Sequence, residues 1–383
     1  MKKTVMALVL GACAAVFAVM PSAALHAGAE SAGYKALYCA DYHSGTAIKA
    51  ENETEHYPIA SMCKIMTLLL CYEAESEGNL SFDEQINVSE RASGMGGSQV
   101  FLEAGAEYPA GELIKSICIA SANDSCVAMA ERLCGSEELF VDKMNDRAHE
   151  LGMNDTLFVN CTGLPAPGQY SCAKDVAKML SELLRHENYF KYSKIWMDKM
   201  QHPEGRVTEM ANTNKMIRSY SGCDAGKTGF TNDAGFCLAA SAMRGNMRVV
   251  SVVIGADSSK TRFETTKESF DYAFANYTNK SVLDGSAPLD EKCPVTGGKK
   301  SEIAVRPERS CYIFCARNDK DDIFYEIEFN KVKAPVAERS VVGQIVVYKN
   351  NIEADRLALV ANEYVARSSY WDALRDVAEG WII

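Results

Sequence analysis

A serine and a lysine three residues apart, in Ser61-Met62-Cys63-Lys64, form the first pattern in this sequence that could do chemistry. On a helix this spacing places both side chains on one face, one turn apart. A serine hydroxyl is a weak nucleophile that needs a neighbouring base, and a lysine amine can be that base. Alone, the tetrapeptide is more often a helix N-cap followed by a solvated lysine. Its meaning therefore depends on partners elsewhere in the chain.

Two further motifs supply such partners. Ser121-Ala122-Asn123 lies at a predicted junction between two helices, and Lys227-Thr228-Gly229 comes just ahead of strand-like sequence. The missing side chains at Gly226 and Gly229 would let a substrate backbone approach an edge strand closely. Helix capping would explain Ser121-Ala122-Asn123 taken alone, and a hairpin turn would explain Lys227-Thr228-Gly229 taken alone. All three motifs in this order, behind an export signal, favour acyl transfer, which needs a nucleophile, a base, an oxyanion hole and a substrate clamp.

We assign the reacting groups as hypotheses. Ser61 is the nucleophile. Lys64 is the base, provided that burial and a second cation such as Lys227 lower its pKa. Ser121 relays a proton to the leaving amine.

The remaining groups are expected to bind the substrate. Asn123 would hydrogen-bond its amide, and Lys227 and Thr228 would hold a carboxylate. Gly229 would leave room beside the strand. The oxyanion hole would use the backbone N–H groups of the nucleophile and of Phe230.

The elements that must position these residues predict an α/β domain followed by an all-β domain. A hairpin over 35–50 precedes a buried apolar helix that begins at Ser61, and helical periodicity follows. The predicted helices cover 111–120, 124–135, 139–151, 173–184 and 260–277, and the predicted strands cover 236–241 and 248–255. A sheet flanked by helices follows from this order.

Beyond residue 300 the pattern becomes short alternating strands, which suit a small sandwich. The stretch before it is rich in glycine and proline and predicts a linker. The last residues, 370–383, have helical period with Tyr370, Trp371 and Trp381 on one face, which suits either a membrane interface or packing onto the protein. The predicted divisions are a signal peptide (1–27), a catalytic domain (28–280), a linker (281–298), a small β-sandwich (299–366) and a C-terminal amphipathic segment that is a candidate membrane anchor (367–383).

Composition narrows the functional class. The net charge of −11 argues against nucleic-acid binding. Lys2 and Lys3, an apolar run and small residues around Ala24 indicate export, to the outer face of the membrane and the cell wall. The 14 cysteines include no CxxC pair, several lie in apolar helical runs, and the histidines have no metal-ligand spacing. We therefore expect mostly free, buried thiols and no metal site.

At these residues the chain resembles the penicillin-binding proteins and serine β-lactamases. Over most of its length it is similar to the low-molecular-mass D-alanyl-D-alanine carboxypeptidases of peptidase family S11. The segments that carry this resemblance are Pro58–Thr67, Ile119–Asp124, Phe158–Leu164 and Gly226–Thr231. The resemblance implies a β-lactamase/transpeptidase-like fold, with an antiparallel sheet flanked by helices and a helical subdomain. It also implies removal of the terminal D-alanine from peptidoglycan stem pentapeptides through an acyl-enzyme, acylation by β-lactams, and no metal or organic cofactor.

Four departures from the family pattern stand out. Ala122 and Ala225 replace residues that are often glycine in relatives, and Cys161 replaces a common proline. Asn212-Thr213-Asn214 lacks an arginine that some relatives use to bind the substrate carboxylate. Lys227 and Thr228 are then the main expected ligands of the substrate carboxylate.

Two alternatives remain. One is a β-lactamase or D,D-endopeptidase of the same fold, although no glutamate over 145–184 lies in a convincing deacylation motif. The other is a non-catalytic penicillin-sensing or wall-binding protein, which would have no need of the base Lys64.

Overall fold

The structure is a computed structural model that describes residues 33–372. Its largest sheet is antiparallel and has five strands in the order β2-β1-β9-β8-β7. These strands are β1 (Ala36–Asp41), β2 (Ala47–Glu51), β7 (Cys223–Thr231), β8 (Gly235–Arg244) and β9 (Met247–Ala256). The third sequence motif lies within β7, which is an edge strand as predicted, and not in a turn before a strand.

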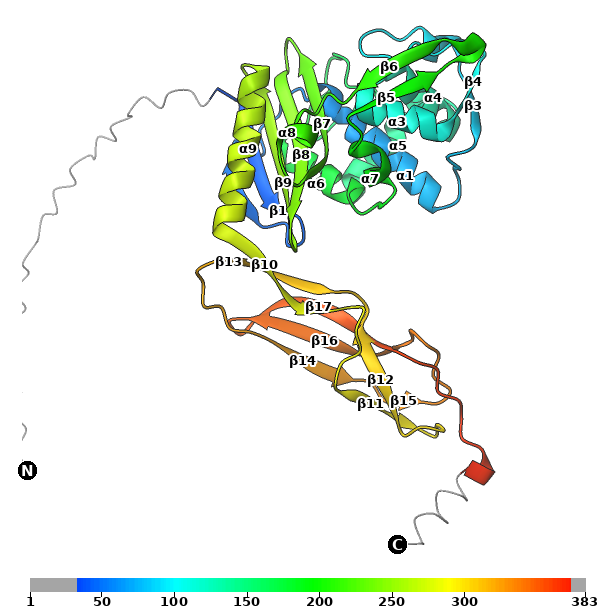
Figure 1. Ribbon diagram of the computed structural model, residues 1–383, viewed down its shortest axis with the longest axis vertical. Coiled ribbons are helices and arrows are strands. Elements are labelled where there is room, and N and C mark those ends of the chain that lie inside the picture. Colours follow the sequence, from blue (N-terminus) through cyan, green and yellow to red (C-terminus); the bar gives the residue numbers. More distant parts are fainter. Residues whose placement is uncertain (1–32, 373–383) are drawn as a thin grey trace, which may run out of the picture. The chain divides into compact units, whose positions relative to one another are not determined.

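Helices cover both faces of this sheet (Figure 1). One face carries α9, and the opposite face carries the helical block that contains α1. Because both faces are covered, β9 is buried along nearly its whole length. The longer helices are α1 (Lys64–Ser76), α3 (Ala110–Ala120), α4 (Asn123–Cys134), α5 (Glu137–Glu150), α6 (Ala173–Leu183) and α9 (Ser259–Asn276). The predicted antiparallel sheet flanked by helices is confirmed.

Short elements connect these parts. A 3₁₀ turn, Ala60–Cys63, precedes α1 and carries Ser61, so the nucleophile lies one turn before the α-helix proper. The remaining short elements are β3 (Gln85–Asn87), α2 (Glu90–Ser93), β4 (Glu107–Pro109), α7 (Tyr189–Ser193), β5 (Met197–Gln201), the 3₁₀ turn Pro203–Gly205, β6 (Val207–Ala211) and α8 (Met216–Ser219). The apolar run after Ser61 is buried in the main core, as its all-round hydrophobicity predicted.

The C-terminal part is all β, as predicted. Six strands form a sheet in the order β14-β16-β17-β12-β11-β15, and β10 pairs with β13. Its strands are β10 (Tyr277–Leu283), β11 (Lys292–Thr296), β12 (Glu302–Pro307), β13 (Cys311–Ala316), β14 (Ile323–Phe329), β15 (Val332–Lys333), β16 (Val341–Lys349) and β17 (Ile352–Ala361). Their inward-facing residues form a separate apolar core. We refer to this part as the β domain.

The predicted linker contains ordered strands. The end of β10 and all of β11 fall within 281–298, and Leu283, Cys293 and Val295 are buried in the core of the β domain. Cys293 and Val295 alternate with exposed residues at period two, a strand signal that the neighbouring prolines and glycines obscured.

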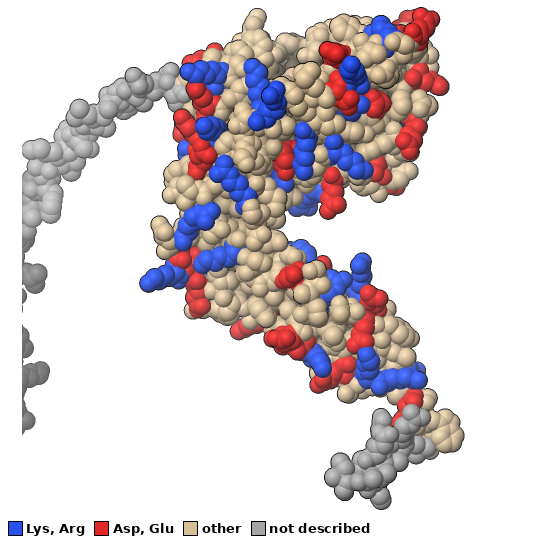
Figure 2. Space-filling model, viewed as in Figure 1, with Lys and Arg blue, Asp and Glu red and all other residues tan. Residues whose placement is uncertain are grey.

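The chain ends fall largely outside the described residues. Residues 1–27, predicted as a signal, are not among them, and of the C-terminal segment only 367–372 are. Within 33–372, no helix combines the length and hydrophobicity needed to cross a bilayer. Basic and acidic side chains are interspersed over the face shown in Figure 2.

Candidate active site

Ser61 is held in place by close backbone contacts on two sides. Its preceding residue, Ala60, has a left-handed backbone with φ +48°, a strained conformation for a residue with a side chain. A Cβ on Gly163 would lie 2.0 Å from the Ala60 carbonyl oxygen, and one on Gly229 would lie 2.7 Å from that of Ile59. Only glycine allows both segments to approach so closely. The nucleophile therefore lies on a turn packed between the loop at Gly163 and strand β7 at Gly229.

Lys64 is fully buried, and its amine points at Ser61. Nζ lies 3.0 Å from Ser61 Oγ and also donates a short hydrogen bond to the carbonyl of Thr162. Burial lowers the pKa of Lys64, because the charged form loses its hydration. An amine with a lowered pKa beside a hydroxyl can accept its proton.

A second serine–lysine pair lies at the junction of α3 and α4. Ser121 ends α3 in a left-handed conformation with φ +63°, and its Oγ accepts a hydrogen bond of 2.8 Å from Lys227 Nζ. Lys227 is 1% exposed. Burial, and then the charge of Lys64, lower the pKa of Lys227 to about 7. The charge of Lys64 thus lowers the pKa of Lys227. From the sequence we expected the same interaction in the other direction, with the charge of Lys227 lowering the pKa of Lys64.

Asn123 is buried beside this junction with one hydrogen-bonding atom unused. Its Nδ2 donates to the Gly96 carbonyl (2.7 Å), and its backbone N–H donates to that of Ser98 (2.7 Å). Within the described part of the chain, its Oδ1 has no hydrogen-bond partner. N-capping of α4 does not explain Asn123, because α4 is capped by Ala122 with no side-chain bond. A buried acceptor left open suits a ligand N–H.

The third motif forms hydrogen bonds with Thr213 and Arg262, and the exposed ring of Phe230 follows it in the chain. Thr228 Oγ1 donates to Thr213 Oγ1 (2.8 Å). Arg262, on α9, donates from Nη1 to the Gly229 carbonyl (3.1 Å). Phe230 is 52% exposed and packs against Phe236. The proposed oxyanion role of the Phe230 N–H stays a prediction.

The glycines of the third motif serve the protein's own packing. A Cβ on Gly226 would meet the Ala239 carbonyl oxygen at 2.5 Å, and Gly226 has φ +146°. On Gly229 the space for a side chain is taken by Ile59 and Ala60. The absent side chains at these two positions are therefore explained by packing within the protein, and the expected approach of a substrate backbone to the edge of β7 stays a prediction.

A groove of about 350 Å³ lies next to the nucleophile. It runs between the segment Pro58–Ala60, which leads into Ser61, and the loop Gly163–Gln169, and it reaches the end of β7. Its lining residues are Pro58, Ile59, Ala60, Gly163, Leu164, Pro165, Ala166, Pro167, Gln169, Thr231 and Asp233.

The cysteines near the site are packing residues. All 13 described cysteines are free and 12 are buried. Cys63, between nucleophile and base, is 0% exposed and donates to the Asn160 carbonyl (3.2 Å). Burial raises its pKa, which keeps the thiol protonated. The described cysteines thus match the expectation of mostly free, buried thiols.

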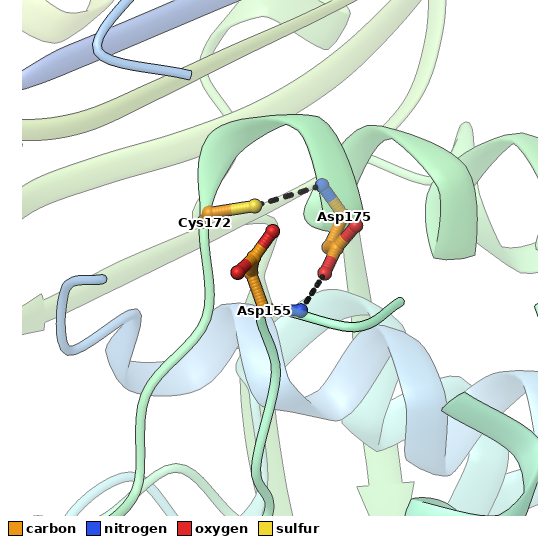
Figure 3. A group of neighbouring side chains, drawn as sticks. All are labelled: Asp155, Cys172 and Asp175. Carbon is orange, nitrogen blue, oxygen red and sulfur yellow. Dashed lines mark hydrogen bonds between the residues drawn. The ribbon is translucent and has the colours of Figure 1, made fainter. Parts of the chain in front are cut away.

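One group of described residues has the composition of a metal site (Figure 3). One ligand atom each of Asp155, Cys172 and Asp175 lie within 4.8 Å of one another. Cys172 Sγ accepts from the Asp175 N–H at the start of α6 (3.4 Å), and the Asp175 carboxylate accepts from the Asp155 N–H (2.9 Å) and from Lys178 Nζ (2.8 Å). Asp155 Oδ1 pairs with His56 Nε2 (3.0 Å). Helix capping and these hydrogen bonds account for the group.

Three groups that contact the active-site residues were not predicted from the sequence. The Thr162 carbonyl is a backbone acceptor that leaves no side-chain signature. Thr213 lies in the segment that was noted only for the arginine it lacks. Arg262 lies on the buried face of α9, at helical spacing from Thr266 and Phe270, and an arginine at that spacing was the one available signal.

Comparisons with known proteins agree with this geometry. A family model described as D-alanyl-D-alanine carboxypeptidase matches residues 24–258, and one described as penicillin-binding protein 5, C-terminal domain, matches 277–367. The chain is 36% identical over 340 residues to the D-alanyl-D-alanine carboxypeptidase DacF of Bacillus subtilis, covering 88% of this chain and 87% of that protein. It is 30% identical to DacC of Escherichia coli, covering 91% and 88%.

A solved structure shows the same architecture. Penicillin-binding protein 5 from Haemophilus influenzae superposes with a TM-score of 0.68 at 25% identity, covering 88% of this chain and 98% of that one. From the matched family models and the identity to curated relatives, the chain belongs to the S11 family of D-alanyl-D-alanine carboxypeptidases.

Proposed function

We propose that this protein is a serine-type D-Ala-D-Ala carboxypeptidase that removes the terminal D-alanine from peptidoglycan stem pentapeptides through a Ser61 acyl-enzyme. The observation that carries the proposal is the meeting of two serine–lysine pairs, Ser61 with Lys64 and Ser121 with Lys227, in a buried site. Such a pairing supplies both a base for the nucleophile and a path for a proton to the leaving group.

Acylation begins when Lys64 takes the Ser61 proton while Oγ attacks the carbonyl carbon of the penultimate D-alanine. The new O–C bond forms, the C–N bond to the terminal D-alanine breaks, and Ser121 relays the proton to the leaving nitrogen. Backbone N–H groups of Ser61 and Phe230 would stabilise the oxyanion. The Asn123 side chain would bind the substrate amide.

Deacylation uses the same base. Neutral Lys64 takes a proton from water as the water oxygen attacks the ester carbon, and it returns the proton to Ser61 when the ester bond breaks. Lys227 and Thr228 hold the substrate carboxylate and favour peptides that end in a free carboxyl group. A β-lactam carries a carboxylate and a strained amide, so it would acylate Ser61 in the same way.

We propose that the enzyme acts outside the cytoplasm, at the membrane and cell wall. The support is the export-type sequence over 1–27 and the two exposed aromatic residues Tyr370 (74%) and Trp371 (75%) at the start of the C-terminal segment. Deleting 367–383 should release the protein from the membrane fraction of a host that exports it. Equal membrane recovery of both forms would contradict a peripheral contact through this segment.

The activity is tested by incubating wild type and Ser61→Ala with a fluorescent penicillin and, separately, with a pentapeptide ending in D-Ala-D-Ala. We expect covalent label and D-alanine release from wild type alone. Label without D-alanine release would instead indicate a penicillin-sensing protein, and rapid turnover of the penicillin would indicate a β-lactamase.

A further inference from the structure

The amine of Lys64 is oriented by a single peptide unit. It donates to the Thr162 carbonyl oxygen, and its other hydrogen-bond neighbour is Ser61 Oγ. Donation to this carbonyl holds Nζ within hydrogen-bond distance of Ser61 Oγ, where the lone pair of the neutral amine could accept the hydroxyl proton. The direction of the Thr162 C=O bond therefore sets the direction of the base.

That direction is fixed from the opposite side by Asn160. Its Oδ1 accepts from the Gly163 N–H (2.7 Å), which belongs to the same peptide unit as the Thr162 carbonyl. In a planar trans peptide the N–H and C=O bonds point in opposite directions. Asn160 Oδ1, the peptide unit and Lys64 Nζ thus form one hydrogen-bonded line. Accepting at one end of a peptide also polarises the carbonyl at the other end.

Asn160 is itself held firmly. Its Oδ1 also accepts from the N–H (3.2 Å) and the hydroxyl (3.1 Å) of Thr162, while its Nδ2 donates to the Leu164 carbonyl (2.9 Å). Its backbone N–H donates to Gln169 Oε1 (3.0 Å).

Two neighbouring carbonyls tie the same loop to α1 and its preceding turn. The Asn160 carbonyl accepts from Cys63 Sγ, and the Cys161 carbonyl accepts from Thr67 Oγ1 (2.7 Å). The loop therefore contacts the nucleophile's helix through three consecutive carbonyls, and the last of these contacts is with the base.

We propose that Asn160 is a positioning residue for the general base, acting on Lys64 through the Thr162–Gly163 peptide. This inference rests on the proposed function. It predicts that Asn160 affects the pKa and the orientation of the Lys64 amine. Other residues that bind the same loop should affect only the stability of the protein.

A matched control lies on α5 and contacts the same loop. Asn145, like Asn160 a half-buried asparagine, binds the loop backbone with both ends of its amide: Oδ1 accepts from the Phe158 N–H, and Nδ2 donates to the Phe158 carbonyl, both at 2.9 Å. Phe158 has no bond to Lys64 in the described structure. Loosening the loop at this position leaves the line through Thr162 in place.

The experiment compares full-length wild type, Asn160→Ala, Asn160→Asp and Asn145→Ala. The second-order rate constant for acylation by a fluorescent penicillin is measured from pH 5 to 10, with thermal unfolding recorded for each variant. Asn160→Ala should lower the rate constant about 10- to 100-fold through misalignment of the base. Its acid limb should move to lower pH, because the ammonium form loses a fixed acceptor.

Asn160→Asp keeps the acceptor oxygen and adds a negative charge, so it should recover much of the rate and move the acid limb to higher pH by about half a unit or more. Asn145→Ala should lower the melting temperature and leave the acid limb unmoved. Equal behaviour of Asn160→Ala and Asn145→Ala would overturn the inference. Failure of wild type to be labelled would instead overturn the proposed function, so the two failures are distinguishable.

Discussion

The two active-site lysines of the catalytic domain and the surface lysine Lys300 of the β domain lie in opposite environments. Lys64 and Lys227 are at most 1% exposed, and neither forms an ion pair with a carboxylate in the described part of the chain. In the β domain, Lys300 has a side chain that is 56% exposed and paired with Glu363. Burying an ammonium group without a countercharge costs free energy and lowers its pKa. The active site thus buries amines without a countercharge, whereas Lys300 of the β domain is exposed and paired.

The two cores differ in the same sense. The polar and charged residues that are buried as whole residues lie between Asp41 and Asn279. Among the described residues beyond Asn279, the Asp321 side chain is 8% exposed and is paired with Lys349. The core of the β domain is built mainly of apolar side chains, with Cys293, Cys311 and Cys315 acting as small hydrophobic residues. A domain that only needs to be stable can bury apolar groups alone, whereas one that moves protons must also bury polar groups.

The largest effect should come from replacing the buried base. Lys64→Arg keeps a positive charge but cannot supply a neutral nitrogen near neutral pH. We expect acylation by penicillin to fall about 10²- to 10⁴-fold, the range for loss of a general base. Stopped-flow or gel-based labelling measures the rate. A rate within a factor of three of wild type would show that the burial of Lys64 serves packing alone.

Next in size is a pair of core substitutions that separates the two domains. Leu68→Ala in α1 and Ile345→Ala in β16 each remove a fully buried side chain and should each cost about 2–5 kcal/mol of stability. Only Leu68→Ala should also lower the acylation rate, because α1 begins at the base. Urea unfolding and penicillin labelling of both variants test this. A comparable loss of acylation in Ile345→Ala would mean that the β domain shapes the active site.

The pH dependence of stability should report the burial of Lys227. Its pKa is lowered from 10.5 to about 7, so between these values the unfolded chain binds more protons than the folded one. The free energy of unfolding of wild type should therefore rise relative to that of Lys227→Met as the pH increases from 7 toward 10, by at most about 1.4 kcal/mol per pH unit. Denaturant titrations at several pH values measure it. A difference that is constant or falls with pH would contradict the lowered pKa.

The smallest effect should come from the surface lysine of the β domain. Lys300→Ala removes an exposed ion pair, which is typically worth less than about 1 kcal/mol. Neither the acylation rate nor the shape of the stability–pH curve should change. A loss comparable to that of a core substitution would mean that this pair is more than a surface contact.

Sequence could predict the motifs because chemistry restricts residue types, and it could predict the sheet and helices because burial restricts periodicity. It could not predict that Gly229 packs on Ile59, since that contact joins segments 170 residues apart. The Thr162 carbonyl left no side-chain signal, although its segment was recognised. In β11, Pro294 indicated a linker, but Cys293 and Val295 on either side of it point into the core.

The central claim is that the serine next to the buried Lys64 is the nucleophile. The most direct measurement is mass spectrometry of wild type after incubation with benzylpenicillin, followed by proteolysis and mapping of the adduct. We predict one penicilloyl group per chain, on the Ser61 hydroxyl, and no adduct in Ser61→Ala. An adduct on another residue, such as Ser121, or an unmodified wild-type chain, would contradict the account.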